Sequence, residues 1–387
     1  MSWHHAFQKS LGISVRVLGL IIFGTIGMVQ TLAVPLGMSK TRPIPSTLIC
    51  IAAGVRGWES IEFQEISQSA REYAGEGRVV ELAVRSPRTY LSQVWRTLSN
   101  SEVTHYLFDP RTGSQNFVGS FFQSFAVGTM LALRGVTPIG YCTDVSERQH
   151  LLQLAFVTAR RGVCVCFMDA LVVGRIFPHR RVIGPSIMPF SIKTFERVSA
   201  LRDNSHSRPK KLVSFVGSLY EPRTTTLLQI QHALEKDGIS FEISTRNLGE
   251  PKGPEDCYWL ALSGSEIQIT TTSQVRHSHR VGDLSEVNQL VYRATEALVC
   301  GAALVIEEVE GMGAYFQDGL HLSSFSTPEG AVAIVKNLLA DRSQLAAIKL
   351  SGQQKIEEII RGQVFWKTID ATLGPFSVQK GIRAGSN

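Results

Sequence analysis

The sequence predicts an α/β protein of two domains, in which each domain is a parallel sheet covered by helices. Apolar strand-like runs alternate with helical patterns, and this alternation is typical of parallel sheets buried on both faces. The 387 residues exceed the usual size of one domain. The charge also divides along the chain, because residues 1–211 hold 24 Lys and Arg against 13 Asp and Glu, whereas residues 212–387 hold 15 against 20.

The predicted boundaries follow from these observations. The polar, proline-containing segment 205–211 lies where the net charge changes from +11 to −5, so it is the natural linker. We expect an apolar N-terminal segment over 1–42, a first domain over 46–204, a second domain over 212–372 and a tail over 373–387. The basic first domain indicates an anionic partner, such as a lipid phosphate, a membrane surface or nucleic acid.

The N-terminal segment contains an apolar stretch long enough to cross a bilayer. Residues 17–38 carry no charged side chain, and Lys and Arg flank them on both sides. As a helix they would span about 33 Å at 1.5 Å per residue. We expect an apolar N-terminal helix that acts as an uncleaved or peripheral membrane anchor. A secretory signal and a start codon placed too far upstream are the alternatives.

The first domain is predicted from five apolar strands separated by helical patterns. The expected strands are residues 46–53, 79–84, 104–108, 137–141 and 162–167. The expected helices are residues 60–73, 88–99, 117–134 and 146–159. Ligands of such sheets bind beyond the carboxyl ends of the strands, so these ends are candidate site positions. They are residues 54–60, 109–111, 142–144 and 168–169.

The second domain begins with a pattern suited to phosphate binding. Residues 211–216 form a strand-like run, 217–223 a glycine-containing turn, and 224–237 a helical pattern. A glycine turn between a strand and a helix N-terminus presents unpaired backbone N–H groups, which commonly hold a phosphate. Arg223, next to the turn, can add a bidentate contact.

Residues 288–308 predict a helix, a glycine stop and a buried strand. Gln289, Arg293 and Glu296 fall on one face of this helix. An apolar stripe occupies another face, formed by Val287, Leu290, Val291, Ala294 and Leu298. Gly301 suits the helix stop, before the apolar residues 302–306. Glu296 lies near the negative end of the helix dipole, which disfavours a carboxylate by roughly a few tenths of a kcal/mol. This placement indicates another role for its charge.

At these residues the sequence resembles the C-terminal half of GT-B glycosyltransferases, whose donor site carries a Glu-Ala-x-x-x-Gly helix followed by a buried strand. The resemblance implies that Glu296 accepts hydrogen bonds from the ribose hydroxyls of a nucleotide-sugar. The alternative is an ordinary amphipathic helix with a solvated Glu296 paired to Arg293. Residues 315–321 and 328–340 resemble the turn and closing helix of the same domain, so residues 211–360 match it in order and spacing.

One position departs from the family pattern. Many retaining members carry a second glutamate eight positions before the first, where this chain has Asn288 followed by Gln289. Amides hydrogen-bond sugar hydroxyls but do not stabilise an oxocarbenium charge as a carboxylate does, so the anomeric outcome stays open. The residues predicted to bind the donor are Gly217, Ser218, Arg223, Asn288, Gln289, Arg293 and Glu296.

The first domain resembles, in the order of its elements, the N-terminal half of spore-maturation (CgeB-like) glycosyltransferases. In this comparison Asp144 or Asp109 is the general base that removes the proton of the acceptor hydroxyl; alternatively, each caps the next helix. Pro110 suits a first helical position, which favours the cap for Asp109. We therefore predict Asp144 as the catalytic residue.

Metal chemistry is not expected. The sequence has no Asp-x-Asp pair for a divalent cation, and its ten histidines show no helix-spaced zinc motif. No cofactor is expected besides the nucleotide-sugar substrate. The six cysteines mostly lie in or beside apolar strands, which favours reduced thiols and a reducing compartment.

The sequence thus predicts a metal-independent glycosyltransferase with two Rossmann-like domains facing across a cleft. The expected partners are a nucleotide-sugar, a glycan or lipid-linked acceptor and a membrane surface, with no nucleic acid. The expected location is the cytoplasm, with attachment to the cytoplasmic face of a membrane through the N-terminal segment. A sugar-nucleotide epimerase of the same fold and a catalytically silent sugar-binding or scaffold protein are the alternatives.

Overall fold

The computed structural model describes residues 48–373, except for 55–59, 101, 113–116, 144–149, 151–152, 155–156, 159–161, 172–173, 175–180, 205–210, 246–254 and 273–287. The apolar stretch 17–38, and with it the predicted N-terminal helix, lies outside the described residues. Within them, no helix is long and apolar enough to cross a membrane.

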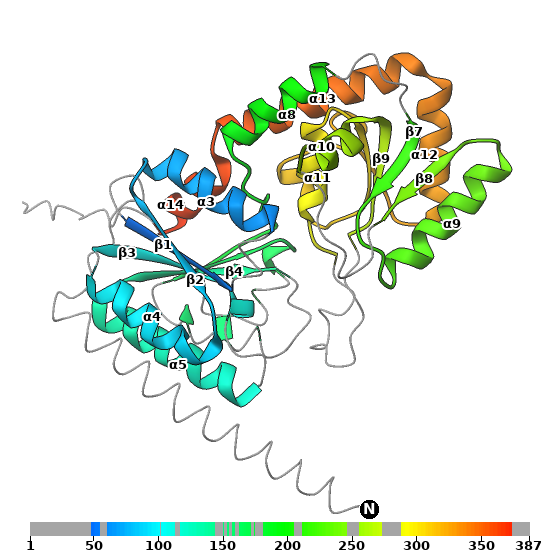
Figure 1. The fold of residues 1–387 in the computed structure, drawn as a ribbon. Coiled ribbons are helices and arrows are strands. Elements are labelled where there is room, and N and C mark those ends of the chain that lie inside the picture. The colour runs from blue at the N-terminus through cyan, green and yellow to red at the C-terminus, as the bar shows by residue number, and fades with distance from the viewer. Residues whose placement is uncertain are drawn as a thin grey trace, which may run out of the picture.

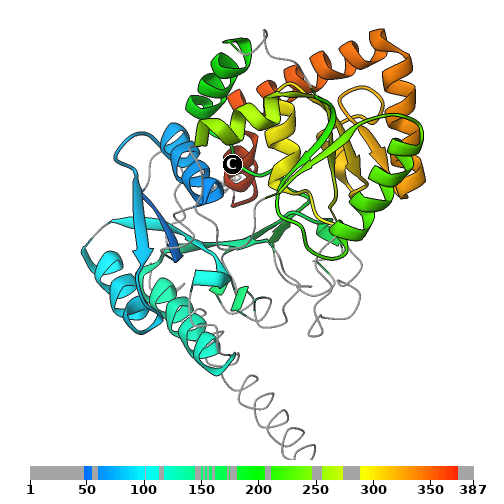
Figure 2. The same ribbon diagram turned by 45° about the vertical axis from the view of Figure 1, so that its right-hand side comes forward.

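The first domain is a six-stranded parallel sheet in the order β2-β1-β3-β4-β5-β6 (Figure 1). The strands are β1 (Leu48–Gly54), β2 (Val79–Val84), β3 (Val103–Phe108), β4 (Thr137–Cys142), β5 (Val163–Cys166) and β6 (Arg181–Ile183). Helix α3 (Ile61–Ala74) covers one face, whereas α4 (Pro87–Asn100) and α5 (Phe117–Arg134) cover the other (Figures 1 and 2). The short helix η2 (Pro110–Thr112) follows β3.

Strand β1 shows why the strands of this sheet are continuous apolar runs in the sequence. Successive side chains of a strand point to opposite faces. Ile49 and Ile51 accordingly pack in the core under α3, while Cys50 and Ala52 pack in the core under α4 and α5. Because both faces are covered, an apolar residue is favoured at every position.

The second domain is a five-stranded parallel sheet in the order β11-β10-β9-β7-β8. Its strands are β7 (Lys211–Val216), β8 (Phe241–Ser244), β9 (Ser265–Thr270), β10 (Ala303–Glu307) and β11 (Ser323–Phe325). Helix α8 (Ile192–Asn204) leads into it from the first domain (Figure 1). The other helices are α9 (Arg223–Lys236), α10 (Glu255–Ser263), α11 (Tyr292–Val299), η4 (Met312–Ala314), α12 (Pro328–Ala340) and α13 (Arg342–Arg361).

The α/β class with two parallel sheets is confirmed, but the predicted helix over residues 288–298 is wrong in its first turn. Helix α11 begins only at Tyr292. The Gln289 N–H donates to the Thr272 carbonyl at 3.3 Å, and the Leu290 N–H donates to the Phe167 carbonyl of the first domain at 2.6 Å. These tertiary bonds hold the segment out of the helix, and the backbone bond of Leu290 joins it to the first domain.

The last helix, α14 (Val364–Leu373), packs on the first domain, although the sequence analysis assigns residues up to 372 to the second. Trp366 is 1% exposed and its indole N–H donates to Ser69 Oγ at 3.0 Å. The Tyr73 hydroxyl of α3 donates to Asp370 at 3.1 Å. Figure 1 shows α14 beside α3, so the chain returns to the first domain after building the second.

The buried His105 of β3 makes stability sensitive to acid. Burial lowers the pKa of its imidazole to about 4, below the ordinary value of 6.5. A lowered pKa contributes stability that is present above pH 6.5 and is lost as the pH falls toward 4. We expect this group to remove about 2 kcal/mol of unfolding free energy between pH 8 and pH 5.

Denaturant unfolding of the wild type and His105→Gln at pH 8 and pH 5 measures this contribution. The variant should lose less stability on acidification, because its glutamine does not titrate. The carboxylates that titrate in this range are common to both proteins, so their contribution cancels in the comparison. Equal losses in the two proteins would show that His105 is not the group that responds.

Candidate functional site

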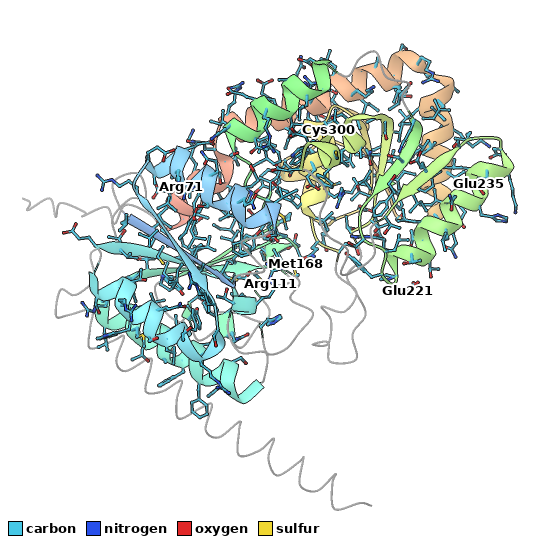
Figure 3. All side chains as sticks on the ribbon, in the orientation of Figure 1. Arg71, Arg111, Met168, Glu221, Glu235 and Cys300 are labelled. Atoms are coloured by element: carbon cyan, nitrogen blue, oxygen red, sulfur yellow. The ribbon has the colours of Figure 1, made fainter. Side chains whose placement is uncertain are left out.

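A polar cleft lies between the two domains, at the carboxyl ends of strands from both sheets. Its volume is about 240 Å³, slightly below the roughly 300–1,000 Å³ typical of small-molecule sites. Figure 3 places Arg111 and Met168 at the edge of the first sheet that faces the second domain. The cleft is lined by Glu62, Thr143, Met188, Phe215, Tyr220, Arg223, Thr270, Gln289, Val291, Tyr292, Arg293 and Glu296.

Glu296 is buried in the wall of this cleft. It is 3% exposed and its Oε2 lies 3.2 Å from Arg293 Nε. Burial raises the pKa of Glu296, and this rise is opposed by the charge of Arg293 and by a hydrogen bond from the Tyr258 hydroxyl. The alternative of a solvated Glu296 is therefore wrong, although its pairing with Arg293 is correct. A carboxylate is costly to bury unless it has partners, which favours a binding role for this one.

Arg293 joins helix α11 to the end of β7. Its Nη1 donates to the Val216 carbonyl, and its guanidinium lies 5.4 Å from the centroid of the Tyr258 ring. A Cβ on Gly217 would lie 3.1 Å from Arg293 Nη2 and 2.9 Å from the Phe215 ring. Gly217 thus allows the close approach of the arginine.

The turn after β7 differs from the predicted phosphate loop. The Gly217 N–H donates to the Ser244 carbonyl at 3.0 Å, so the prediction that it is unpaired is wrong. Ser218 provides its carbonyl oxygen to Arg223 Nη1 at 3.2 Å. The cationic group from this turn that lines the cleft is therefore the Arg223 side chain, and the backbone N–H of Gly217 is already paired.

Arg223 is held firmly at the cleft wall. It is 8% exposed; its Nε donates to Thr271 Oγ1 at 2.9 Å and its Nη2 to the Thr271 carbonyl at 3.4 Å. Its guanidinium stacks on the Tyr220 ring at 4.2 Å from the centroid. This geometry fixes a positive charge at the carboxyl end of the second sheet.

The two amide side chains predicted at the site, Asn288 and Gln289, do not both line the cleft. Gln289 is 6% exposed and lines the cleft. The Asn288 side chain donates to the Glu308 carbonyl at 2.8 Å and does not line the cleft. Asn288 thus stabilises the segment before α11.

Of the two candidate bases, Asp144 lies outside the described residues. The preceding Thr143 lines the cleft, so the end of β4 reaches the site. Asp109 is the cap that its sequence favours: its Oδ1 accepts the Arg111 backbone N–H at 2.8 Å, and its carboxylate binds the Arg111 side chain at 3.0 and 2.9 Å.

Glu62 is a cleft carboxylate that sequence reasoning missed. It lies in the first turn of α3, accepts the Tyr141 hydroxyl at 2.7 Å and lies 3.6 Å from Arg111. The candidate positions predicted after the first strand are residues 54–60, and Glu62 lies two residues beyond them. The same strand-end rule points to Thr143, whereas no pattern identifies Thr270, Tyr220 or Tyr292.

Among the described residues, no group of three or more His, Cys, Asp or Glu side chains is placed to hold a metal ion. All six cysteines are free thiols, and only Cys257 is exposed. Burial raises the pKa of the Cys50 thiol to about 12, so this side chain acts as a packing group.

Part of this chain is similar in sequence to a known protein family. Residues 231–360 match a family described as glycosyl transferase-like, and this stretch holds Gln289, Arg293 and Glu296. Among curated proteins, none matches the chain.

Solved structures share the fold at very low sequence identity. A glycosyltransferase from Rickettsia africae has a TM-score of 0.54 and 6% identity over 84% of this chain and 98% of its own. The α,α-trehalose 6-phosphate synthase of Burkholderia multivorans has a TM-score of 0.52 and 10% identity over 85% and 96%. HepE of Anabaena, solved with UDP and glucose, has a TM-score of 0.50 and 11% identity over 84% and 98%. The chain therefore has the two-domain fold of these proteins.

Proposed function

We propose that this protein is a glycosyltransferase that uses a nucleotide-sugar bound in the cleft between its domains. The observation that carries the proposal is the buried Glu296 beside Arg293 in the cleft wall, within the stretch that matches the glycosyl transferase-like family. The complex of HepE with UDP and glucose supports this ligand class, because that protein shares the fold.

In the proposed complex the nucleotide lies on the second domain. The Glu296 carboxylate accepts hydrogen bonds from the ribose hydroxyls, and the Arg223 guanidinium neutralises the diphosphate. The fixed positive charge of Arg223 stabilises the departing diphosphate, and we propose that the transfer proceeds without a metal. Gln289 borders the same cleft, where its amide can hydrogen-bond the ligand.

The acceptor enters from the first domain. Its hydroxyl oxygen bonds to the anomeric carbon, the bond from that carbon to the diphosphate oxygen breaks, and the acceptor proton passes to a base. We propose Asp144 for this base, because Thr143 already lines the cleft. The acceptor class proposed is a glycan or a lipid-linked glycan.

The test incubates the protein with a panel of nucleotide-sugars, with and without candidate acceptors, and measures the release of the nucleoside diphosphate and the sugar products. A transferase releases it with formation of a new glycoside. An epimerase either releases it together with an altered free sugar or returns an altered nucleotide-sugar without net release of the diphosphate. A silent sugar-binding protein binds the nucleotide-sugar without release or alteration. Absence of both release and binding across the panel would overturn the proposal.

We also propose that the protein works at an anionic membrane surface. Helices α4 and α5 pack together on the outside of the first domain and contain no Asp or Glu (Figures 1 and 2). Their exposed side chains include the apolar Trp95, Phe122 and Leu133. Arg88, Arg96 and Arg134 are exposed beside them. Exposed aromatic and basic side chains on two helices that contain no acidic residue suit the headgroup region of anionic lipids.

Vesicle binding measures this surface. The full chain should bind vesicles of anionic lipid, and the binding should fall steeply with added salt, because charges are screened within about 8 Å at physiological ionic strength. The double change Arg88→Gln and Arg96→Gln should weaken binding more than Lys336→Gln with Lys355→Gln, which removes the same charge from the second domain. Salt-independent binding, or equal losses in the two variants, would contradict this assignment.

A further inference from the structure

Among the residues that the structure describes, three hydroxyl groups of the cleft lining are buried without a hydrogen-bond partner. They are Thr143 Oγ1, Thr270 Oγ1 and Tyr292 Oη. Thr143 is 2% exposed and Thr270 is 1% exposed. A buried hydroxyl without a partner destabilises the fold, so its retention at a cleft wall points to a partner that arrives with a ligand.

The three groups come from different elements and are held in place. Thr143 follows β4 of the first sheet, Thr270 ends β9 of the second, and Tyr292 begins α11. The Tyr292 ring stacks on Phe190 at 5.9 Å between centroids and packs against hydrophobic cores of both domains. Its hydroxyl is therefore positioned before any ligand binds, and burial raises its pKa so that it remains protonated.

The cleft is also electrically divided. On the second-domain wall Arg293 is paired with Glu296, and Arg223 adds a further positive charge. On the first-domain wall Glu62 lies beside the Tyr141 hydroxyl and 3.6 Å from Arg111. A diphosphate therefore favours the wall that carries Arg223. Neutral hydroxyls instead suit the hydroxyl groups of a sugar, which both donate and accept hydrogen bonds.

We infer that Thr143 and Tyr292 hydrogen-bond the hydroxyls of the transferred sugar and so determine which sugar the enzyme accepts. Thr270 is adjacent to Thr271, whose hydroxyl accepts a hydrogen bond from Arg223. We therefore assign the Thr270 hydroxyl to the diphosphate of the nucleotide-sugar and not to its sugar. This inference rests on the proposed function, because it assigns the sugar of a nucleotide-sugar to one end of the same cleft.

The variants Thr143→Val and Tyr292→Phe remove these hydroxyls with little change of shape. Calorimetric titration without acceptor would compare UDP with UDP-glucose, or the matching pair for the nucleotide-sugar that the panel selects. Each variant should bind the nucleotide-sugar about five- to tenfold more weakly, as expected for one hydrogen bond, and bind the nucleoside diphosphate within about twofold of wild type. Thr270→Val should weaken both ligands alike.

A second measurement separates ligand contacts from structural ones. Thermal unfolding of the unliganded Thr143→Val and Tyr292→Phe variants should show an unchanged or raised Tm, because a buried unsatisfied group has been removed. Ser199→Ala is the matched control, since Ser199 Oγ is also buried without a partner but lies outside the cleft lining. It should keep the wild-type affinity for both ligands.

Several results would overturn the inference. Unchanged affinity for the nucleotide-sugar would mean that water satisfies the hydroxyls. Equal losses of affinity for both ligands would mean that the hydroxyls contact the nucleotide. If the variants lose transfer activity with acceptor present but keep the wild-type affinity for the nucleotide-sugar, the hydroxyls contact the acceptor. A lowered Tm would indicate a structural role. These failures leave the proposed function intact, whereas a wild type that binds no nucleotide-sugar refutes the proposed function itself.

Discussion

Replacement of Glu296 by glutamine should weaken binding of the donor nucleotide by about 1.5–3 kcal/mol, or roughly 10- to 150-fold, the usual contribution of hydrogen bonds to a charged group. Glutamine keeps the shape of the side chain but replaces one acceptor oxygen with a donor and removes the charge. The Arg293 guanidinium keeps the Val216 carbonyl and the Tyr258 ring as partners, so the cleft wall should persist. Titration of the nucleoside diphosphate measures the effect.

Glu65→Gln is a suitable control for this experiment. Glu65 is also buried, at 4% exposure, and accepts the Ser191 N–H at 2.7 Å and the Thr194 hydroxyl at 2.6 Å. Burial raises its pKa as it does for Glu296. The change should lower stability without changing nucleotide affinity. Equal nucleotide affinity in wild type and Glu296→Gln would refute the ribose contact.

Replacement of Trp366 by alanine should cost about 3–5 kcal/mol of unfolding free energy, the usual range for a large aromatic side chain removed from a core. Trp366 of α14 is buried against the first sheet and its indole N–H is bonded to Ser69. The loss also weakens the attachment of the C-terminal helix to the first domain. Denaturant unfolding of the full chain measures it.

Trp95→Ala is the matched control for Trp366→Ala. Trp95 lies on α4 and is 46% exposed, so its removal should change stability by only about 0.5 kcal/mol or less. A loss in Trp366→Ala no larger than that in Trp95→Ala would show that α14 is not part of the core of the first domain.

Strands β1 to β5, β7 and β10 were predictable because burial on both faces imposes continuous apolar runs. Residues 79–84 are predicted and observed with the same bounds as β2, and residues 328–340 with the same bounds as α12. By contrast, β8, α10 and β9 carry polar residues such as Glu242 and Gln268 within short runs, and the sequence analysis does not identify them. The Gln268 amide nitrogen donates to Ser214 Oγ at 2.7 Å, a tertiary contact that a local pattern does not encode.

The candidate site was predictable on the second domain and much less so on the first. Arg223, Gln289, Arg293 and Glu296 are all brought to one cleft, because a strand end and a helix place them there. Glu62 and Tyr292 reach it only through docking of the domains, which the bond from the Leu290 N–H to the Phe167 carbonyl helps to fix. Spacing along a chain does not report such docking. The same bond explains why the helical spacing of residues 288–291 misleads.

The central claim is that the cleft binds a nucleoside diphosphate on the second domain, and a crystal structure of the full chain with UDP or the diphosphate selected by the panel tests it most directly. We expect both ribose hydroxyls within hydrogen-bond distance of the Glu296 carboxylate and the diphosphate beside the Arg223 guanidinium. A nucleotide bound elsewhere, or one in the cleft with its ribose turned away from Glu296, would contradict the account.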